Sequence, residues 1–423
     1  MRTTKWERAV PVYGVPVLTR AFYVLASIFG VALILTVWRE YFGLANPVSG
    51  MTDGFAWGIW KTFNVMVLTG LGSGGFAVGI GAWIFNNHKL HTVMRTALLT
   101  SFMAYGTGLV MLGIDVGRPW NFYWVALPWA WNGHSPLLEV AVCVSLYTCV
   151  PLLLENVPPV LEYFIYKVPN YRPTVEKIEA VFTKVYPFII ALAYLLPMMH
   201  QSSLGALMLL AGPRLSGLWQ SPFLPLLYVW AAAWLGYSCV VLALVLPALA
   251  WKRPLDLDVL GLLNKIAVNL VLAWTAFRFL VILVRGDIGL AFQFTSDAFL
   301  FWLETATILG AALVLRSESG KKVSKMFYAH CVLATGGMIY RFSPTTLAFH
   351  PRGGALYFPA AMELITCMGF ISLGIMGYLF AVKKLAILPA SIEDWKKMEA
   401  YEAKAPKDPF ARYLSGKQYA TAD

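Results

Sequence analysis

Charged side chains are scarce in this chain. Only 13% of its 423 residues are Asp, Glu, Lys or Arg, while 59% are hydrophobic and the mean hydropathy is +0.65. A soluble protein carries about 25% charged residues, which keep its surface solvated. The composition therefore excludes a soluble fold of this size and predicts an all-α, polytopic membrane protein.

Cysteine and histidine are also rare, with five and six residues respectively. No C-x-x-C sequence and no Cys/His pair at metal-ligand spacing occurs, and every cysteine falls inside an apolar run. The sequence thus predicts neither a disulfide framework, nor an iron–sulfur cluster held by this chain, nor a metal site. The cysteines are Cys143, Cys149, Cys239, Cys331 and Cys367.

Long hydrophobic runs take the place of these motifs. About ten runs are long enough to cross a bilayer as helices, and those longer than the bilayer requires should be tilted or kinked. They predict a transmembrane domain over residues 20–390, after an N-terminal segment, 1–19, and before a polar tail, 391–423. The first run has spanning length and is expected to remain as an uncleaved helix. The runs cover residues 20–38, 55–85, 93–114, 135–154, 181–210, 223–250, 262–284, 296–315, 325–342 and 357–382.

The net charge of +11 would suggest a nucleic-acid partner in a soluble protein. Here the positive residues instead gather in the loops and termini on one side of the membrane. With ten spans, one side of the membrane holds 25 Lys and Arg residues and the other side holds 7. By the positive-inside rule, both termini are expected in the cytoplasm of a bacterial cell, with the domain in the inner membrane. No nucleic-acid partner is expected.

A repeat is suggested by the order of the spans. Runs two to five and six to nine pass through the membrane in the same sequence of directions. Asp115 and Arg118 end the third run much as Arg285 and Asp287 end the seventh. The match suggests two related four-helix bundles with one flanking helix at each end of the chain.

One polar stretch, P-M-M-H-Q-S-S-L-G-A-L at 197–207, lies inside an apolar run. Pro197 is expected to bend the helix, and a kink followed by four polar side chains suggests a pocket. The alternative is that the two serines, Ser202 and Ser203, bond to their own helix while His200 bonds to a neighbouring one.

Most ionisable residues of the spans gather toward the outer face, whereas the inner halves are nearly apolar. Because a charge near the bilayer centre costs about 2.5–3.5 kcal/mol, each such group needs a partner or a role. Asp115 and Arg118 could simply form an ion pair that fixes a loop, and Arg341 could be an ordinary interfacial charge. Taken together, however, the groups predict one polar pocket beneath the outer surface. They are Asp115, Arg118, His134, Glu139, His200, Gln201, Arg278, Glu304, Arg341 and Glu363.

A quinone would use such a pocket, because it needs an apolar slot, hydrogen bonds at its carbonyls and groups that move protons. His200, Gln201 and Ser202 could bind the carbonyls, while Glu139 and Glu304 could move protons. Two other functions stay open. Carboxylates in both bundles also suit a proton or ion transporter, although the inner halves offer no polar path. A di-haem cytochrome b would need paired imidazoles, for which His134 and His200 are the only candidates at similar depth.

Six motifs, in order along the chain, resemble the NrfD/PsrC family. Within that family they are most similar to the ten-helix branch that includes the HybB subunit of nickel–iron hydrogenases and the QrcD subunit of the quinone reductase complex. The resemblance extends from about Gly14 to Leu388. The motifs are I-D-V-G-R-P-W-N at 114–121, S-x-x-x-E at 135–139, M-H-Q-S-S-L-G-A-L-M at 199–208, W-Q-S at 219–221, F-W-L-E at 301–304 and G-G-A-L-Y-F-P-x-x-x-E-L at 353–364.

This resemblance implies a haem-free membrane anchor that exchanges electrons with menaquinone or ubiquinone. The implied partners are a periplasmic ferredoxin-like iron–sulfur subunit and its catalytic subunit, a hydrogenase or another periplasmic oxidoreductase. His134 and Lys61 do not belong to the family pattern. The positions that match it are Asp115, Arg118, Glu139, His200, Gln201, Ser202, Arg278, Glu304, Arg341 and Glu363.

On this hypothesis the chain is an integral subunit of a respiratory oxidoreductase, with quinone in the outer half of the first bundle. Glu139, His200 and Glu304 are the expected catalytic groups. Asp115 and Arg118 would shape the mouth of the pocket or dock the extrinsic partner. The remaining candidates would line the binding site.

Overall fold

The computed structural model is built from long helices. It describes residues 8–400 apart from 44–48, 53, 56, 117, 168–171, 252, 318–319, 321, 355, 392, 394–395 and 398–399. Within this part of the chain, nine helices are long and apolar enough to cross a membrane. The all-α, polytopic fold class is therefore confirmed.

The count of ten spans is approximate. The ninth expected span is present as α14 (Val323–Phe342), a helix of 20 residues that is less apolar than the other nine. Lys325, His330 and Arg341 lie on it. A helix that carries this much polarity has to face protein, and both His330 and Arg341 are fully buried.

The first bundle contains four spans. The first of them is assembled from α2 (Ile59–Thr62), α3 (Leu68–Leu71) and α4 (Gly74–Gly79), which π-helical turns join or extend. A short helix, α5 (His88–His91), follows, and then α6 (Met94–Asp115). The next span runs through α7 (Pro136–Tyr147), a π-helical turn (Thr148–Leu152), α8 (Leu153–Glu155) and α9 (Val157–Lys167). The last is α10 (Arg172–Leu209).

Two boundaries differ from the sequence prediction. The run predicted to end at residue 154 continues as helix to Lys167, and the run predicted to start at 181 starts at Arg172. The added start of α10, R-P-T-V-E-K-I-E-A at 172–180, is polar, so hydropathy alone could not include it, whereas most of α9 is apolar and continues the span before it. Pro187 and Pro197 both lie inside α10, which continues through them as one helix.

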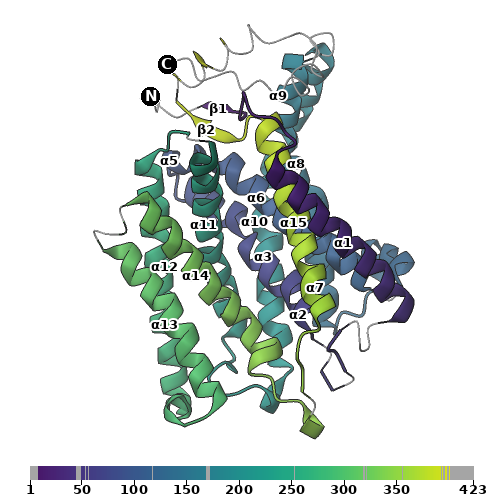
Figure 1. Cartoon of the computed structure of the whole chain (residues 1–423), viewed down its shortest axis with the longest axis vertical. Coiled ribbons are helices and arrows are strands. Elements are labelled where there is room, and N and C mark those ends of the chain that lie inside the picture. The colour runs from purple at the N-terminus through teal and green to yellow at the C-terminus, as the bar shows by residue number, and fades with distance from the viewer. Residues whose placement is uncertain are drawn as a thin grey trace.

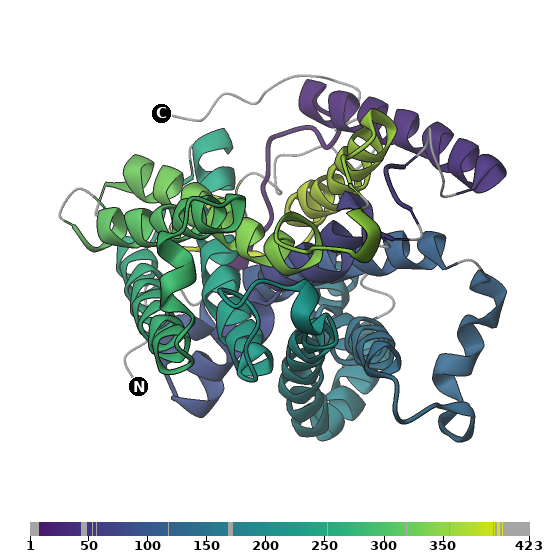
Figure 2. The same cartoon turned by 90° about the horizontal axis from the view of Figure 1, so that it is seen from below.

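The second bundle consists of α11 (Leu224–Trp251), α12 (Leu257–Val284), α13 (Ser296–Arg316) and α14. The flanking helices, α1 (Arg20–Phe42) and α15 (Ala361–Lys384), pack against each other, and α15 also contacts α6 (Figures 1 and 2). Most of α1 is exposed in the structure, as expected of a helix that faces lipid.

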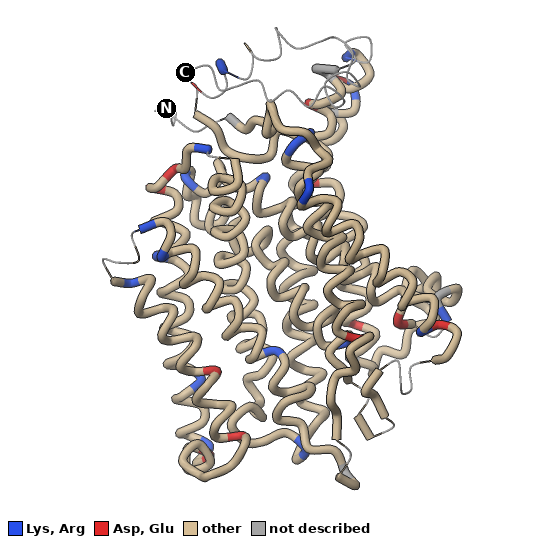
Figure 3. Tube along the Cα trace, viewed as in Figure 1, with Lys and Arg blue, Asp and Glu red and all other residues tan. Residues whose placement is uncertain are grey.

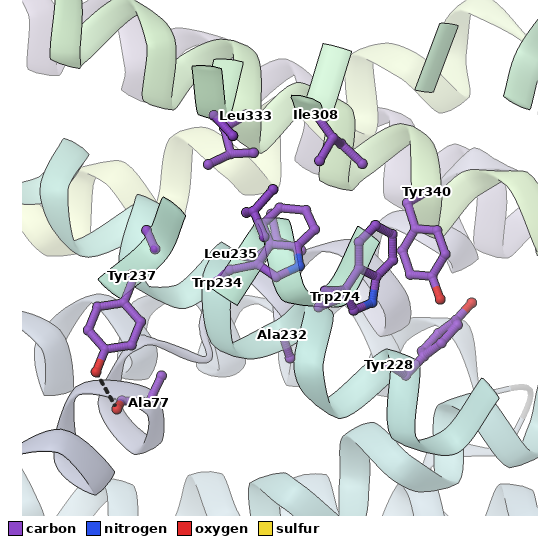
Figure 4. Packing of buried hydrophobic residues seen from close by; sticks show 14 of the residues in the cluster. Ala77, Tyr228, Ala232, Trp234, Leu235, Tyr237, Trp274, Ile308, Leu333 and Tyr340 are labelled. Atoms are coloured by element: carbon purple, nitrogen blue, oxygen red, sulfur yellow. Dashed lines mark hydrogen bonds between the residues drawn. The ribbon is translucent and has the colours of Figure 1, made fainter. Parts of the chain in front are cut away.

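Helix α11 joins the two bundles, because it packs against α12 and α14 on one side and against α4 and α10 on the other. Glycines allow this close approach: a Cβ atom on Gly236 would lie 2.6 Å from the backbone nitrogen of Gly74. The glycine-rich stretch at 70–75 thus serves helix packing, as the sequence suggested. Around α11, the rings of Trp234, Trp274 and Tyr340 pack edge to face (Figure 4).

A small antiparallel sheet closes one end of the bundle. Strand β1 (Arg8–Val10) pairs with β2 (Leu388–Ala390), so that Ala9 lies opposite Pro389 (Figure 1). We call this end the strand end and the other the opposite end. Charged residues gather toward the two ends, and the middle of the bundle carries few (Figure 3). Most of the predicted polar tail, 391–423, lies outside the described residues.

Candidate functional site

His200 and Gln201 lie side by side on α10 and are buried in the first bundle, with 1% and 0% of their surfaces exposed. The Nδ1 atom of His200 lies 3.2 Å from the carbonyl oxygen of Val140, and the Gln201 amide nitrogen donates to the Tyr105 hydroxyl at 3.2 Å. A carbonyl can only accept, so Nδ1 carries the proton of this bond and the neutral ring keeps Nε2 as an acceptor. Both Nε2 and the Gln201 Oε1 atom are buried and have no partner among the described residues.

Aromatic rings connect this pair to a neighbouring helix. The Tyr105 ring lies 5.8 Å from the His200 ring and 4.8 Å from the Tyr147 ring, measured between centroids. The Tyr147 hydroxyl is fully buried and finds no hydrogen-bond partner in the described structure. The backbone carbonyl of Asn64 lies close to Gly108 of α6, one turn from Tyr105, and the Asn64 Nδ2 and Oδ1 atoms are buried with no partner among the described residues.

Arg341 reaches this region from the second bundle. Its Nη2 atom donates to the Tyr228 carbonyl at 2.8 Å, and its guanidinium lies over the Tyr228 ring. The guanidinium of Arg341 also lies beside Gly70 of the first bundle, and its charge acts on Tyr105 and His200. Its Nε and Nη1 atoms are buried, again with no partner in the part of the chain described.

We call these six residues the central cluster: Asn64, Tyr105, Tyr147, His200, Gln201 and Arg341. Five of the six keep at least one buried polar atom that has no partner in the part of the chain that the structure describes. Each such atom costs about 1–3 kcal/mol, and native proteins leave few of them. The cluster is therefore suited to bind a polar ligand group or water between the bundles.

A second cluster, in the second bundle, is fully paired. Glu304 forms a buried ion pair with Arg278, and its Oε2 atom accepts from the Trp219 indole and the Ser343 hydroxyl, both at 3.0 Å. We call these four residues the paired cluster. A cavity beside it, lined by Trp219, Arg278 and Tyr340, has room for about one water molecule.

A third cluster joins the flanking helix α1 to the first bundle at the opposite end. Asp115 is 4% exposed at its side chain and forms ion pairs with Arg39 of α1 and Lys61 of α2. Arg118 is exposed, so the predicted pair of Asp115 with Arg118 is wrong. The loop backbone turns after α6 and carries Arg118 away, whereas tertiary packing brings two distant cations to the carboxylate. Lys61, whose role the sequence left open, is one of them.

Glu363 lies near this cluster, in the first turn of α15. Its carboxylate accepts from the backbone nitrogen of Trp60 at 3.2 Å and from the Tyr357 hydroxyl at 3.0 Å. A Cβ atom on Gly58 would collide with the same carboxylate. Burial, with help from the Glu363 charge, holds the pKa of the Tyr357 phenol above its ordinary range. Glu363 therefore fixes the start of α2 against α15.

Four predicted site residues join none of these three clusters: Arg118, His134, Glu139 and Ser202. Glu139 and His134 are exposed at the start of α7 and in the loop before it. The Ser202 hydroxyl donates to the Met199 carbonyl of its own helix at 2.9 Å, the alternative weighed from the sequence. The candidates that the sequence grouped in one pocket thus lie in three clusters or outside them. The reason is that they come from helices that face different interfaces.

Several polar residues of these clusters were missed from the sequence: Arg39, Asn64, Tyr105 and Tyr147. Asn64 is an amide side chain inside a predicted span, a signal that could have been used. The tyrosines gave no such signal, because an aromatic residue in a span is ordinary. The halves of the helices nearer the strand end are also less apolar than predicted, since His330 and Glu155 are both buried there.

The comparisons with known proteins agree with this architecture. The family described as "Polysulphide reductase, NrfD" matches residues 47–343. The chain is 34% identical over 381 residues to the "Probable Ni/Fe-hydrogenase 2 b-type cytochrome subunit" of Escherichia coli strain K12, covering 89% of this chain and 94% of that protein. It is 30% identical over 240 residues to the "Menaquinone reductase, integral membrane subunit" of Nitratidesulfovibrio vulgaris strain Hildenborough, covering 55% of each.

The name of the first relative raises the question of a b-type haem in this chain. Two axial histidines have to face one iron from opposite sides. The only pair that the sequence offered at similar depth does not fit, because His134 is exposed in a loop while His200 is buried and bonded to Val140. No group of three or more His, Cys, Asp or Glu suited to a metal ion occurs among the residues described.

Proposed function

Because the chain belongs to the NrfD family, we propose that it is the quinone-binding membrane subunit of a respiratory oxidoreductase. It would exchange electrons between an iron–sulfur partner and menaquinone or ubiquinone. The observation that carries this proposal is the central cluster, five of whose residues bury polar atoms that have no partner among the described residues. A quinone presents two carbonyl oxygens and an apolar ring, which are complementary to donors set among tyrosine rings.

Four residues of the central cluster, Asn64, His200, Gln201 and Arg341, have chemical roles in this proposal. The Arg341 and Asn64 groups donate hydrogen bonds to the quinone oxygens, and the fixed charge of Arg341 stabilises negative charge that develops on reduction. His200 accepts or returns a proton at Nε2. Gln201 orients the Tyr105 hydroxyl through the bond that it donates. Glu304 is a positioning residue, because its ion pair with Arg278 holds α12 and α13 beside α14.

The partner is a ferredoxin-like iron–sulfur protein with its catalytic subunit, a hydrogenase or a related oxidoreductase. Two relatives support this class of complex, because the name of one includes "Ni/Fe-hydrogenase 2" and the name of the other includes "Selenate reductase". The partner would dock at the opposite end, which is nearer the central cluster. Exposed aromatic residues of the loop between α6 and α7 lie at that end: Trp120, Tyr123, Trp124 and Trp129. The chain itself would supply no redox centre and no haem.

The lysine and arginine bias supports a bacterial inner-membrane location with the strand end in the cytoplasm and the opposite end in the periplasm. On this orientation residues 1–19 and 391–423 are cytoplasmic. Reporter fusions after Lys89 and after Arg214 should give opposite compartments. The same compartment for both would contradict this topology.

The test replaces His200 by alanine in the purified complex and compares two activities. Quinone-linked turnover should fall about 100-fold, whereas turnover with a soluble electron acceptor should stay within about twofold. Ser202→Ala is the matched control, since Ser202 bonds only to its own helix, and it should leave both activities unchanged. Equal loss of both activities in an intact His200→Ala complex would contradict a quinone role.

A further inference from the structure

The buried atoms of the central cluster that have no partner among the described residues differ in the hydrogen bonds that they can form. Asn64 offers one donor and one acceptor, and the Tyr147 hydroxyl can act as either. On α10, however, these atoms are His200 Nε2 and Gln201 Oε1, which only accept. On α14 they are Nε and Nη1 of Arg341, which only donate. The cluster therefore has an acceptor side on α10 and a donor side on α14.

The surrounding protein fixes the acceptor side. His200 bonds through its other ring nitrogen, Nδ1, to the Val140 carbonyl at 3.2 Å, and since a carbonyl cannot donate, Nδ1 carries the proton. The Nε2 atom of the neutral ring is left with a lone pair. The Gln201 amide is oriented by its nitrogen, which donates to the Tyr105 hydroxyl at 3.2 Å, so its oxygen is left as an acceptor. Neither atom can pair with a ligand that has no proton to donate.

The acceptor side and the donor side border the same region, around Tyr105. The Tyr105 hydroxyl accepts from Gln201, and the Tyr105 ring lies 5.8 Å from the His200 ring, measured between centroids. The charge of Arg341 acts on both Tyr105 and His200. One ligand headgroup beside Tyr105 can therefore reach both sides.

The two redox forms of a quinone differ in the atoms that these sides recognise. The oxygens of a quinone only accept hydrogen bonds, so they pair with Arg341 but leave His200 Nε2 and Gln201 Oε1 without a donor. The hydroxyls of a quinol accept from arginine in the same way, and they also donate to the imidazole and amide atoms. A buried acceptor that stays unpaired loses its hydration without compensation, and this cost falls on the quinone form alone.

We propose that the central cluster binds quinol more tightly than quinone, with a quinol hydroxyl donating to His200 Nε2. This inference rests on the proposed function and names the redox form that the site prefers. The expected preference is at least about tenfold. A tenfold preference for the reduced form raises the midpoint potential of the bound two-electron couple by about 30 mV relative to the quinone pool. The bound quinone then draws electrons from the iron–sulfur partner more strongly than quinone in the pool does.

The first experiment compares two bicyclic compounds that the complex can neither oxidise nor reduce, so that the redox state of the iron–sulfur partner stays constant. Naphthol, hydroxylated at the ring position that bears a quinone oxygen, represents the quinol. Tetralone, with a carbonyl at the same position, represents the quinone. Each compound displaces a radiolabelled quinone analogue from the purified complex, and naphthol should bind at least about tenfold more tightly. Equal affinities, or tighter binding of tetralone, would overturn the preference.

His200→Phe removes the acceptor and keeps a ring of similar size. In this complex the affinity for naphthol should fall until the two compounds bind within about threefold of each other, while the affinity for tetralone stays within about twofold. Ser202→Ala is the matched control, since the Ser202 hydroxyl bonds only to its own helix, and it should keep the tenfold ratio. A tenfold ratio that survives in an assembled His200→Phe complex would overturn the role of His200.

A redox titration tests the unmodified complex and so does not depend on the assembly of a variant. Menaquinone bound to the complex should have a midpoint potential at least about 30 mV above that of menaquinone in protein-free liposomes. A potential equal to or below that of the liposomes would overturn the inference. Failure of the proposed function has a different result: neither compound would displace the analogue, and His200→Ala would leave quinone-linked turnover unchanged.

Discussion

In the second bundle, both carboxylate oxygens of Glu304 have donors, from Arg278, Trp219 and Ser343. In the first bundle, at a similar distance from the opposite end, His200 and Gln201 each keep a buried atom without a partner in the described structure. The paired cluster and the central cluster therefore bury polar groups for different purposes. Complete pairing indicates a structural role, whereas incomplete pairing indicates a place for a ligand.

The largest expected effect comes from breaking the paired cluster. Glu304→Ala leaves the Arg278 guanidinium buried without its counter-charge, which should cost about 3–5 kcal/mol of stability. Thermal unfolding of the purified complex measures this loss. The double variant Glu304→Leu with Arg278→Met should recover most of the stability, since no charge then remains unpaired. A stable Glu304→Ala complex that has lost only quinone-linked turnover would give the paired cluster a catalytic role instead.

A smaller loss is expected at the opposite end, where solvent partly reaches the ion pairs. Asp115→Asn removes the counter-charge of Arg39 and Lys61 and should cost about 1–3 kcal/mol. The loss should appear as faster hydrogen exchange in α1, because Arg39 ties that helix to the bundle. Arg118→Ala, at the exposed neighbour, should leave exchange in α1 unchanged. Equally faster hydrogen exchange in both variants would instead support the ion pair of Asp115 with Arg118 that the sequence suggested.

Asn64→Leu separates binding from stability in the first bundle. Its buried amide has no partner in the described structure, so replacing it with a side chain of similar size should leave the free energy of unfolding within about 1 kcal/mol or raise it. Quinone-linked turnover should nevertheless fall about tenfold, which corresponds to about 1.4 kcal/mol. A loss of stability without a loss of turnover would show that the amide is a structural group.

The smallest effect is expected at Glu139. The sequence favoured this residue as a proton relay, but its side chain is exposed at the start of α7 while the adjacent Val140 faces the cluster. Glu139→Gln should change quinone-linked turnover by less than about twofold. A tenfold loss of quinone-linked turnover in an assembled complex would show that Glu139 takes part in proton transfer, at the opposite end of the bundle.

The sequence predicted the fold well because helix existence depends on local hydropathy, which each span carries in its own residues. It also placed His200 and Gln201 in one region, since they are neighbours on one helix, and both are buried there; their role in binding stays a prediction. It could not assign partners across helices. Asp115 was matched to the nearest cation along the chain, although Arg39 lies 76 positions away and reaches it through the packing of α1.

A photoreactive quinone analogue, bound to the purified complex and followed by peptide mapping, tests the central claim most directly. The account predicts labelling of peptides from the spans that carry Asn64 and His200, and loss of that label in the His200→Ala complex. Labelling confined to α12 and α13, around Arg278 and Glu304, would contradict the claim that the central cluster, and not the paired cluster, binds quinone.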